Sequence, residues 1–370
     1  MNRSGLLLLF IGLAACSPPV TKSKEKIEEF RQYLENSRID DGVLLESRKL
    51  AGPDALAWEN SGKYQGDILL DDSQLEDLVA DFAGVSDSGN RNAFIVANTR
   101  WPSNIMIYQI GANEFSKYKL LYSQQQAIRT AMSWIEHFSC VRFRRRTNER
   151  VFVRMTGNPT GCYAHVGFST AHPNRVLNLA RNSAHCFRHV VIIHELLHSL
   201  GFQHMHQTHE RDTYVRINWN NVISGQEFAF TKYNRNQVSL HGLPYEYTSA
   251  MHYHNQAFSR NRQPTITALR TFSGTMGQRD HATYWDWLRL RRHYNCPGAW
   301  TRSTQDLKDE VERTLPLIKM NLPAPERGPF TDVDNAYVEA LLTTVDEDTN
   351  NENTFNEEVE NFNEDTVNED

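Results

Sequence analysis

The stretch HELLHSLGFQH, which begins at His194, constrains the fold more than any other part of the chain. On an α-helix, His194 and His198 would project from the same face, so both imidazoles could reach one metal ion. Gly201 permits the sharp turn that would bring His204 to the same point. Three imidazoles and an open position are typical of a catalytic zinc site. Glu195, next to the first ligand, is then the expected general base.

Apolar spacing elsewhere predicts a mixture of strands and helices without an internal repeat. The segment HVVIIHELLHSL is apolar almost all round, so its helix is expected to be buried. Strands are predicted at 104–110, 151–155 and 175–180, and helices at 125–138, 189–200 and 283–294.

A second segment, TSAMHYH, has neither a helical nor a strand period. A tight turn carrying Met251 would suit the floor of a metal site, because a thioether fills irregular space. Tyr253 could reach the ion or the substrate. Read alone, the segment would indicate core packing, and it gains a functional meaning only from the histidine motif.

The N-terminus, MNRSGLLLLFIGLAAC, has one arginine, a short apolar run and small residues at its end. This pattern is typical of a secretory signal peptide over residues 1–16 and is too short to span a membrane. We therefore expect a secreted, extracellular protein. The same residues also resemble a lipoprotein box, so a lipid anchor through Cys16 is the alternative if the source is bacterial. No other stretch is long and apolar enough for a membrane span.

Without the signal peptide, four cysteines remain. An even number in a secreted chain predicts two disulfides, for which three pairings are possible. The cysteines are Cys140, Cys162, Cys186 and Cys296.

The charge of the chain is unevenly placed. The formal net charge is −6, which gives no reason to expect a nucleic-acid partner. Residues 331–370 carry 14 Asp and Glu residues and no Lys or Arg, so the rest of the chain is about +8. Such a segment repels itself and lacks a core, which predicts disorder. A solvated tail and an exosite for basic partners both remain open.

HELLHSLGFQH and SAMHY together resemble the metzincins, and within them the astacin family of secreted zinc endopeptidases. The resemblance covers roughly residues 92–296 and includes RWPSNIMIYQI, GCYAHVG and RDTYVRINWNNV. It implies an α+β, two-lobed catalytic domain. A twisted, mostly antiparallel-edged sheet with two long helices would lie above the cleft, and an irregular lower lobe with a C-terminal helix below it.

The resemblance also implies the roles of individual residues. One Zn²⁺ per chain would be bound by His194, His198 and His204, with Glu195 as the general base. Tyr253 would be a switchable fifth ligand, and Met251 would be the methionine of the Met-turn. The implied disulfides are Cys140–Cys296 and Cys162–Cys186.

The segment before the catalytic domain resembles the family's propeptide. In YQGDILL, Asp67 is implied to block the zinc, so the precursor would be latent. The expected boundaries are a propeptide at 17–91, a catalytic domain at 92–297 and an acidic, disordered tail at 298–370. Residues 17–91 are charged and helical at first and then loop-like, which is poor material for an independent core.

Substrate contacts are implied at two places. An extended protein or peptide substrate would pair with an edge strand near residues 163–167. Arg279, in GQR, matches a position that lines the S1′ pocket in relatives, where a cation would favour an acidic P1′ residue. The other expected partner is an activating protease, and the chain is expected to be a monomer.

The chain departs from the family pattern just after the third histidine. Relatives carry a glutamate that anchors the new N-terminus, whereas this chain has Met205, and Thr208 replaces an arginine. A thioether is only a weak acceptor, so the anchoring of a mature N-terminus at residue 92 or 93 is in doubt. His206 and His209 are surplus histidines, interpreted as solvated or outer side chains, with a second metal or a pH-sensitive contact as alternatives. Val190 replaces a frequent glycine.

Two functions follow. The first is a secreted zinc endopeptidase made as a zymogen, with Glu195 as general base. The alternative is a catalytically weak, astacin-like extracellular binding protein, suggested by the departures at Met205 and Thr208. The intact ligands and Glu195 favour the enzyme.

Overall fold

The computed structural model describes residues 22–39, 61–84, 99–110, 120–233, 235, 237–301 and 304–325. None of the helices in these ranges is long and apolar enough to cross a membrane. The predicted signal peptide lies outside them. The α-helices are α1 (Lys24–Ile39), α3 (Asp72–Ala83), α4 (Tyr122–Phe138), α5 (His189–Ser199), α6 (Tyr284–His293) and α7 (Gln305–Lys319). The strands are β1 (Ile68–Leu69), β2 (Ile105–Ile110), β3 (Arg142–Arg145), β4 (Phe152–Thr156), β5 (Cys162–His165), β6 (Asn174–Leu179), β7 (Val215–Ile217) and β8 (Ile266–Ala268).

Six strands form one mixed sheet in the order β1-β5-β6-β4-β2-β3, and β7 pairs with β8 separately. Strands β6, β4, β2 and β3 run parallel to one another, whereas β5 is antiparallel to β6. Strand β1, from the leader, extends the sheet beyond β5. The predicted α+β class is confirmed, with the antiparallel pair toward one edge of the sheet.

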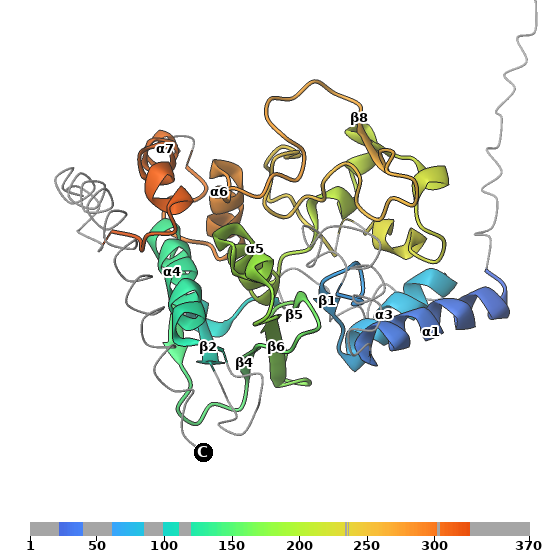
Figure 1. Cartoon of the computed structure of the whole chain (residues 1–370), viewed down its shortest axis with the longest axis horizontal. Helices are drawn as coiled ribbons and strands as arrows, with labels where there is room; N and C mark the ends of the chain where they lie inside the picture. Colours follow the sequence, from blue (N-terminus) through green and yellow to red (C-terminus); the bar gives the residue numbers. More distant parts are fainter. Residues whose placement is uncertain are drawn as a thin grey trace, which may run out of the picture.

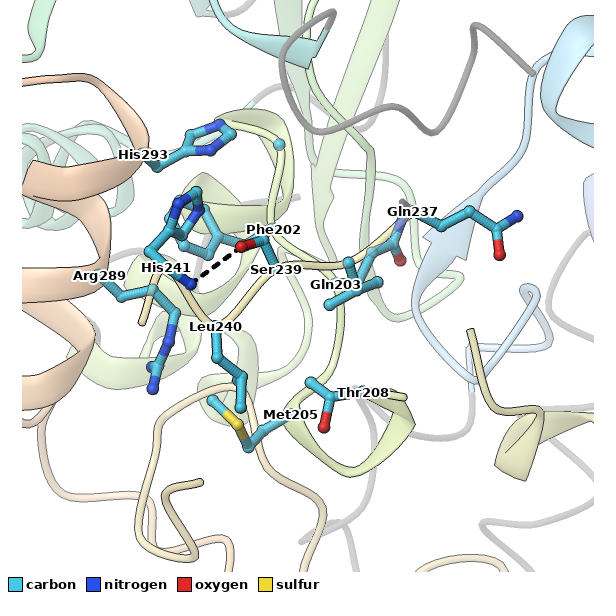
Figure 2. Close-up of a pocket in the computed structure, with 12 residues that line it drawn as sticks. Phe202, Gln203, Met205, Thr208, Gln237, Ser239, Leu240, His241, Arg289 and His293 are labelled. Atoms are coloured by element: carbon cyan, nitrogen blue, oxygen red, sulfur yellow. Dashed lines mark hydrogen bonds between the residues drawn. The ribbon is translucent and has the colours of Figure 1, made fainter. Parts of the chain in front are cut away.

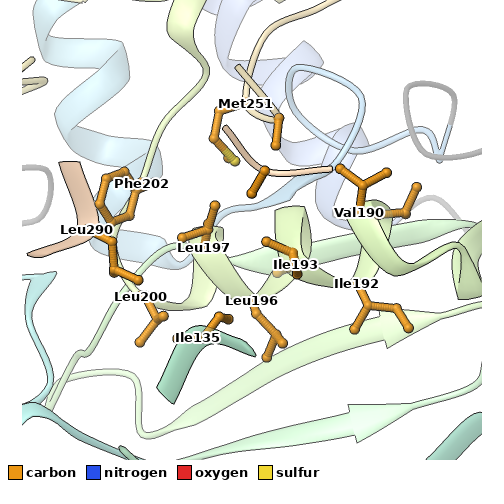
Figure 3. Packing of buried hydrophobic residues seen from close by; sticks show 14 of the residues in the cluster. Ile135, Val190, Ile192, Ile193, Leu196, Leu197, Leu200, Phe202, Met251 and Leu290 are labelled. Carbon is orange, nitrogen blue, oxygen red and sulfur yellow. The ribbon is translucent and has the colours of Figure 1, made fainter. Parts of the chain in front are cut away.

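Helices α4 and α5 lie side by side over the sheet (Figure 1). Helix α4 buries Ile128, Met132 and Ile135, the residues whose spacing predicted it. All 11 residues of α5 are buried, as expected for a helix that is apolar all round. Figure 3 shows why: Ile135 of α4 lies on one side of α5, and Met251, from the chain between β7 and β8, lies on another. Helix α5 is therefore packed between α4 and the segment that contains Met251.

Two disulfides join distant parts of the catalytic domain. Cys140, after α4, is bonded to Cys296, after α6. Cys162 of β5 is bonded to Cys186 in the short helix η4 (Ala184–Phe187) before α5. These are the pairs implied by the family resemblance.

The leader has more structure than its sequence predicted. Helix α1 was expected, but the part expected to be loop-like contains β1 and α3. The leader builds its core jointly with the catalytic domain: the Phe30 ring of α1 lies 4.3 Å from that of Phe82 and 4.7 Å from that of Phe228. Phe228 belongs to the catalytic domain, so the leader alone gave no sign of this core.

The disorder expected after residue 297 does not hold for the first part of that segment. Residues 305–319 were assigned to a disordered tail but form α7, which packs against α4 and α6 (Figure 1). Val311, Leu317 and Ile318 are buried, and the Trp134 indole donates to the Leu322 carbonyl at 2.8 Å. The abundant charges around these apolar residues concealed the helix. The acidic segment beyond residue 325 lies outside the described residues.

Replacing Leu317 with Ala should test whether α7 is part of the catalytic domain. The side chain is fully buried, so we expect a loss of about 2–4 kcal/mol of unfolding free energy, measured as a lower thermal midpoint. The matched control is Met320→Ala, because Met320 follows the same helix and is exposed. Equal midpoints for the two variants would show that α7 contributes nothing to the domain.

Candidate active site

Helix α5 and the turn after it bring three histidines together. His194 and His198 lie one helical turn apart on α5. The chain then reverses at Gly201, where φ is 102° and an added Cβ would lie 2.5 Å from the Thr99 hydroxyl. Only glycine satisfies both conditions without strain. His204 follows this turn, so the spacing that predicted the cluster has a defined backbone cause.

The three histidines surround the carboxylate of Asp67 in a buried cluster. The Asp67 Oδ2 atom lies 3.1 Å from Nε2 of His194 and 3.1 Å from Nε2 of His204. The Asp67 Oδ1 atom lies 3.6 Å from Nε2 of His198. All four donor atoms lie within 4.8 Å of one another. Nitrogen and oxygen donors at these separations fit around one zinc ion, whose bonds to such atoms measure about 2.0–2.2 Å.

Backbone carbonyls fix the orientation of the first two imidazoles. Nδ1 of His194 lies 2.7 Å from the Ala250 carbonyl oxygen, and Nδ1 of His198 lies 2.7 Å from that of Phe202. Each Nδ1 therefore carries the proton and donates it, which leaves the lone pair of Nε2 directed into the cluster. This arrangement is common around protein-bound zinc.

Glu195 is buried beside this cluster. Neither of its carboxylate oxygens has a hydrogen-bond partner among the described residues. Burial, followed by the negative charge of Asp67, raises the pKa of the Glu195 carboxyl well above its usual value. A buried carboxyl without a partner is costly. The orphaned oxygens therefore fit a site that receives a metal ion together with a water or substrate.

The leader occupies the remaining side of the cluster. Burial alone would raise the pKa of Asp67, but the neighbouring imidazoles, above all the charge of His204, hold it well below its usual value. Strand β1 runs parallel to β5, and the Ala164 amide donates to the Asp67 carbonyl at 2.9 Å. The leader thus pairs with the strand on which an extended substrate was expected to lie.

Tyr253 and Met251 lie next to the histidines. The Tyr253 hydroxyl donates to the backbone carbonyl of Gln65 in the leader, and its ring lies 4.7 Å from the His204 ring. Met251 is buried against α5 (Figure 3), and its carbonyl accepts a hydrogen bond from the Met205 amide at 2.8 Å. The leader therefore engages the tyrosine that the family resemblance assigns to the site.

An aspartate that no motif marked holds the turn around Met251. Asp286 of α6 accepts hydrogen bonds from the Ser249 hydroxyl at 2.5 Å and from the Ala250 amide at 2.9 Å. The same carboxylate caps the start of α6 with Thr283. Because the Ala250 carbonyl orients His194, Asp286 acts on the first histidine through this turn.

The segment that departs from the family pattern lines a small cavity (Figure 2). Met205 and Thr208 lie on one side of it, with Leu240 and Arg289 also in its lining. Its volume is about 30 Å³, which is room for one water molecule. Nη1 of Arg289 lies 3.4 Å from Oδ1 of Asp286, so this cation has a carboxylate partner. Met205, which stands where relatives have a glutamate, cannot provide one.

The two surplus histidines differ from each other. His206 is fully buried, and its ring lies 3.9 Å from that of Tyr253. Burial, followed by the charge of His204, lowers the pKa of His206 well below its usual value. The expectation that His206 is exposed to solvent is therefore wrong. The other expectation, that it packs outside the three histidines, agrees with its position. His209 lies 3.1 Å from the Glu210 carboxylate near the surface.

Arg279 lies in a groove next to the start of α5. The groove has a volume of about 480 Å³, and Arg188, Val190 and Lys319 also line it. Val190 precedes His194 by one helical turn, so the groove begins beside the cluster. Nη1 of Arg279 lies 3.5 Å from the His185 ring. The sequence did not predict that Lys319, at the end of α7, would line this groove.

Comparison with known proteins gives a consistent result. Residues 94–295 match the family model of the astacin peptidases. The chain is 30% identical over 278 residues to zinc metalloproteinase nas-6 of Caenorhabditis elegans, covering 75% of this chain and 73% of that protein. It is 36% identical over 242 residues to seminal metalloprotease 1 of Drosophila melanogaster, covering 64% and 88% respectively.

A solved structure is also similar. High choriolytic enzyme 1, a hatching enzyme zinc-protease from Oryzias latipes, matches with a TM-score of 0.46 and 34% sequence identity. The match covers 53% of this chain and 93% of that chain.

Proposed function

Since the chain belongs to the astacin family and is therefore a zinc metalloendopeptidase, we propose that it is secreted as a latent precursor and hydrolyses peptide bonds once its leader is removed. The observation that carries this proposal is the Asp67 carboxylate among the three Nε2 atoms of the histidine cluster. The signal peptide predicted at residues 1–16 and the two disulfides support secretion. Cys16, the alternative site of a lipid anchor, lies outside the described residues.

In the proposed reaction, His194, His198 and His204 hold the zinc. When bound, zinc supplies a Lewis acid and lowers the pKa of water at the site. Glu195 takes a proton from the attacking water and passes it to the leaving amine. Tyr253, once the leader no longer accepts its hydroxyl proton, hydrogen-bonds the tetrahedral intermediate.

Latency follows from three contacts of the leader. Asp67 lies among the three histidines, where its carboxylate would bind zinc in place of water. Strand β1 covers the edge of β5, and the Gln65 carbonyl accepts the Tyr253 hydroxyl proton. A carboxylate oxygen is an adequate zinc ligand, so the precursor would bind metal without reacting. We place the leader at residues 17–91 and the start of the mature chain at 92, and we extend the catalytic unit to residue 325 to include α7.

A casein zymogram tests the proposed activity. We expect the processed protein to clear casein, and a zinc chelator to abolish the clearing, because the site depends on the metal. The alternative, a catalytically weak binding protein, predicts no clearing with or without the chelator. Sequencing the N-terminus of the active species would locate the processing site, and a start far from residue 92 would refute the boundary.

Arg279 should set the preference for the residue after the scissile bond. Its guanidinium lines a groove that begins one helical turn from His194, and a carboxylate pairs well with a guanidinium. We expect a peptide library to show enrichment of Asp and Glu at P1′, and Arg279→Gln to reduce that enrichment by about tenfold. Arg270→Gln, on a different loop, is the control. An unselective P1′ position in the unmodified enzyme would refute the role.

A further inference from the structure

A buried cation outside the histidine cluster has its carboxylate partner in the leader. Arg175 of β6 is 1% exposed, and its Nη1 atom lies 2.6 Å from Oδ2 of Asp71. The partner residue immediately precedes α3, whereas Arg175 belongs to the catalytic domain. If the leader departs, Arg175 therefore stays behind without its carboxylate.

The catalytic domain holds this guanidinium in place independently of the leader. Nε of Arg175 donates to the Gly167 carbonyl at 3.0 Å, and Nη2 donates to the Val166 carbonyl at 2.6 Å. Both acceptors directly follow β5. Two of the three nitrogens are thus fixed by backbone, and the third points toward the leader. A planar guanidinium positioned in this way is prepared to bind a carboxylate.

Arg175 lies on the path that an extended chain follows along β5. From Asp67 in the histidine cluster, the leader pairs Ile68 with Ala164 and Leu69 with His165. It reaches the guanidinium at Asp71, four residues after Asp67. At about 3.3 Å per residue, this is roughly 13 Å from the cluster. A substrate of ordinary extended geometry would span the same distance.

The role of Asp71 inside the leader does not account for Arg175. The Oδ1 atom of Asp71 accepts the Gln74 amide at 2.9 Å and caps α3. A cap of this kind needs no cation. The Oδ2 atom of Asp71 pairs with Nη1 of Arg175. Nε2 of His172, a second basic side chain, lies 3.8 Å from Oδ1 of Asp71. The basic pair belongs to the catalytic domain and remains in the mature enzyme.

We propose that, in the leader-free enzyme, Arg175 forms a substrate subsite that selects an Asp or Glu side chain about four residues from the scissile bond, over the end of β5. This inference rests on the proposed function, because it requires removal of the leader. The leader carboxylate occupies the subsite in the precursor, and a substrate carboxylate replaces it after processing. A carboxylate that takes the place of Asp71 would form a charge-assisted hydrogen bond with Nη1 of Arg175, which gives acidic substrates their advantage.

The test uses processed, leader-free enzyme and pairs of fluorogenic peptides that differ only in Glu or Gln, four residues from the scissile bond on either side. At one of these two positions, we expect kcat/KM for the Glu peptide to exceed kcat/KM for the Gln peptide by about 10- to 100-fold. This is the range for a hydrogen bond to a charged group. Arg175→Gln should bring this ratio close to 1, whereas Arg175→Lys should retain part of it. Arg154→Gln, on the neighbouring strand β4, is the matched control and should keep the full ratio.

Two outcomes would overturn the subsite. One is an unmodified enzyme that cleaves the Glu and Gln peptides equally at both positions, a result that requires no variant to fold. The other is an unchanged ratio in Arg175→Gln. Binding of the same peptides to Glu195→Gln enzyme, measured by fluorescence anisotropy, separates this inference from the proposed function. A preference for Glu in binding without any cleavage by the unmodified enzyme would support the subsite and refute the peptidase.

Discussion

Replacing Glu195 with Ala is expected to abolish peptide cleavage while zinc stays bound. The carboxylate lies beside the histidine cluster but is not one of the four donor groups that lie together. Loss of a general base lowers the rate by about 10²- to 10⁴-fold, so processed Glu195→Ala should fall at least about 100-fold in kcat/KM. Zinc content, measured by atomic absorption on the same sample, should remain at one ion per chain.

Two further variants sharpen this result. Glu195→Gln keeps the size of the side chain but cannot accept a proton, so it should be as inactive as the alanine variant. Glu210→Gln changes a more exposed glutamate outside the cluster and should keep normal activity. Substantial cleavage by either Glu195 variant would contradict the role of general base. Loss of zinc along with activity would instead identify Glu195 as a residue that supports the metal site.

Replacing Asp67 with Asn should make the unprocessed precursor active. The Asp67 carboxylate lies among the three Nε2 atoms, where its charge would face a bound zinc ion, and one interaction with a charged group contributes about 1.5–3 kcal/mol. Losing one such contribution would shift the equilibrium between the site blocked by the leader and the accessible site by about 10- to 100-fold toward the accessible one. We therefore expect the unprocessed variant to cleave a fluorogenic peptide at least about tenfold faster than the unmodified precursor.

The control for this prediction is Asp72→Asn. Asp72 lies five residues further along the leader, pairs with Arg38 and is largely exposed. That variant should remain latent. Processing must be blocked or monitored by gel in each assay, so that activity is assigned to intact chains. Equal latency of the two variants would contradict the blocking role of Asp67.

The arrangement of the three histidines was predictable because it depends on local geometry. Helical periodicity places His194 and His198 on one face, and the turn requires a residue that tolerates φ near 102°, which Gly201 provides. The strands β2, β4 and β6 and the helices α4, α5 and α6 were likewise predictable, since each has a continuous apolar pattern. These features need no information from distant parts of the chain.

The features that escaped prediction all depend on contacts between distant segments. The charged residues of α7 conceal a narrow apolar face that is visible only once α4 supplies its partner. The leader's aromatic residues need Phe228 to complete a core. Asp71 and Arg175 are 104 residues apart, and neither lies in a recognisable motif. For His206 the sequence left a solvated and an outer side chain as options, and only its contact with the distant Tyr253 decides between them.

The joint core of leader and catalytic domain has a kinetic consequence. Cutting one peptide bond leaves the contacts of Phe30 with Phe228, of Asp71 with Arg175 and of β1 with β5 in place. The severed leader then has to dissociate before any substrate can enter. Activation should therefore show a lag whose length depends on the dissociation rate of the leader, and adding more activating protease should not shorten it beyond that limit. Dilution should leave the lag unchanged, because departure of the leader is a first-order event.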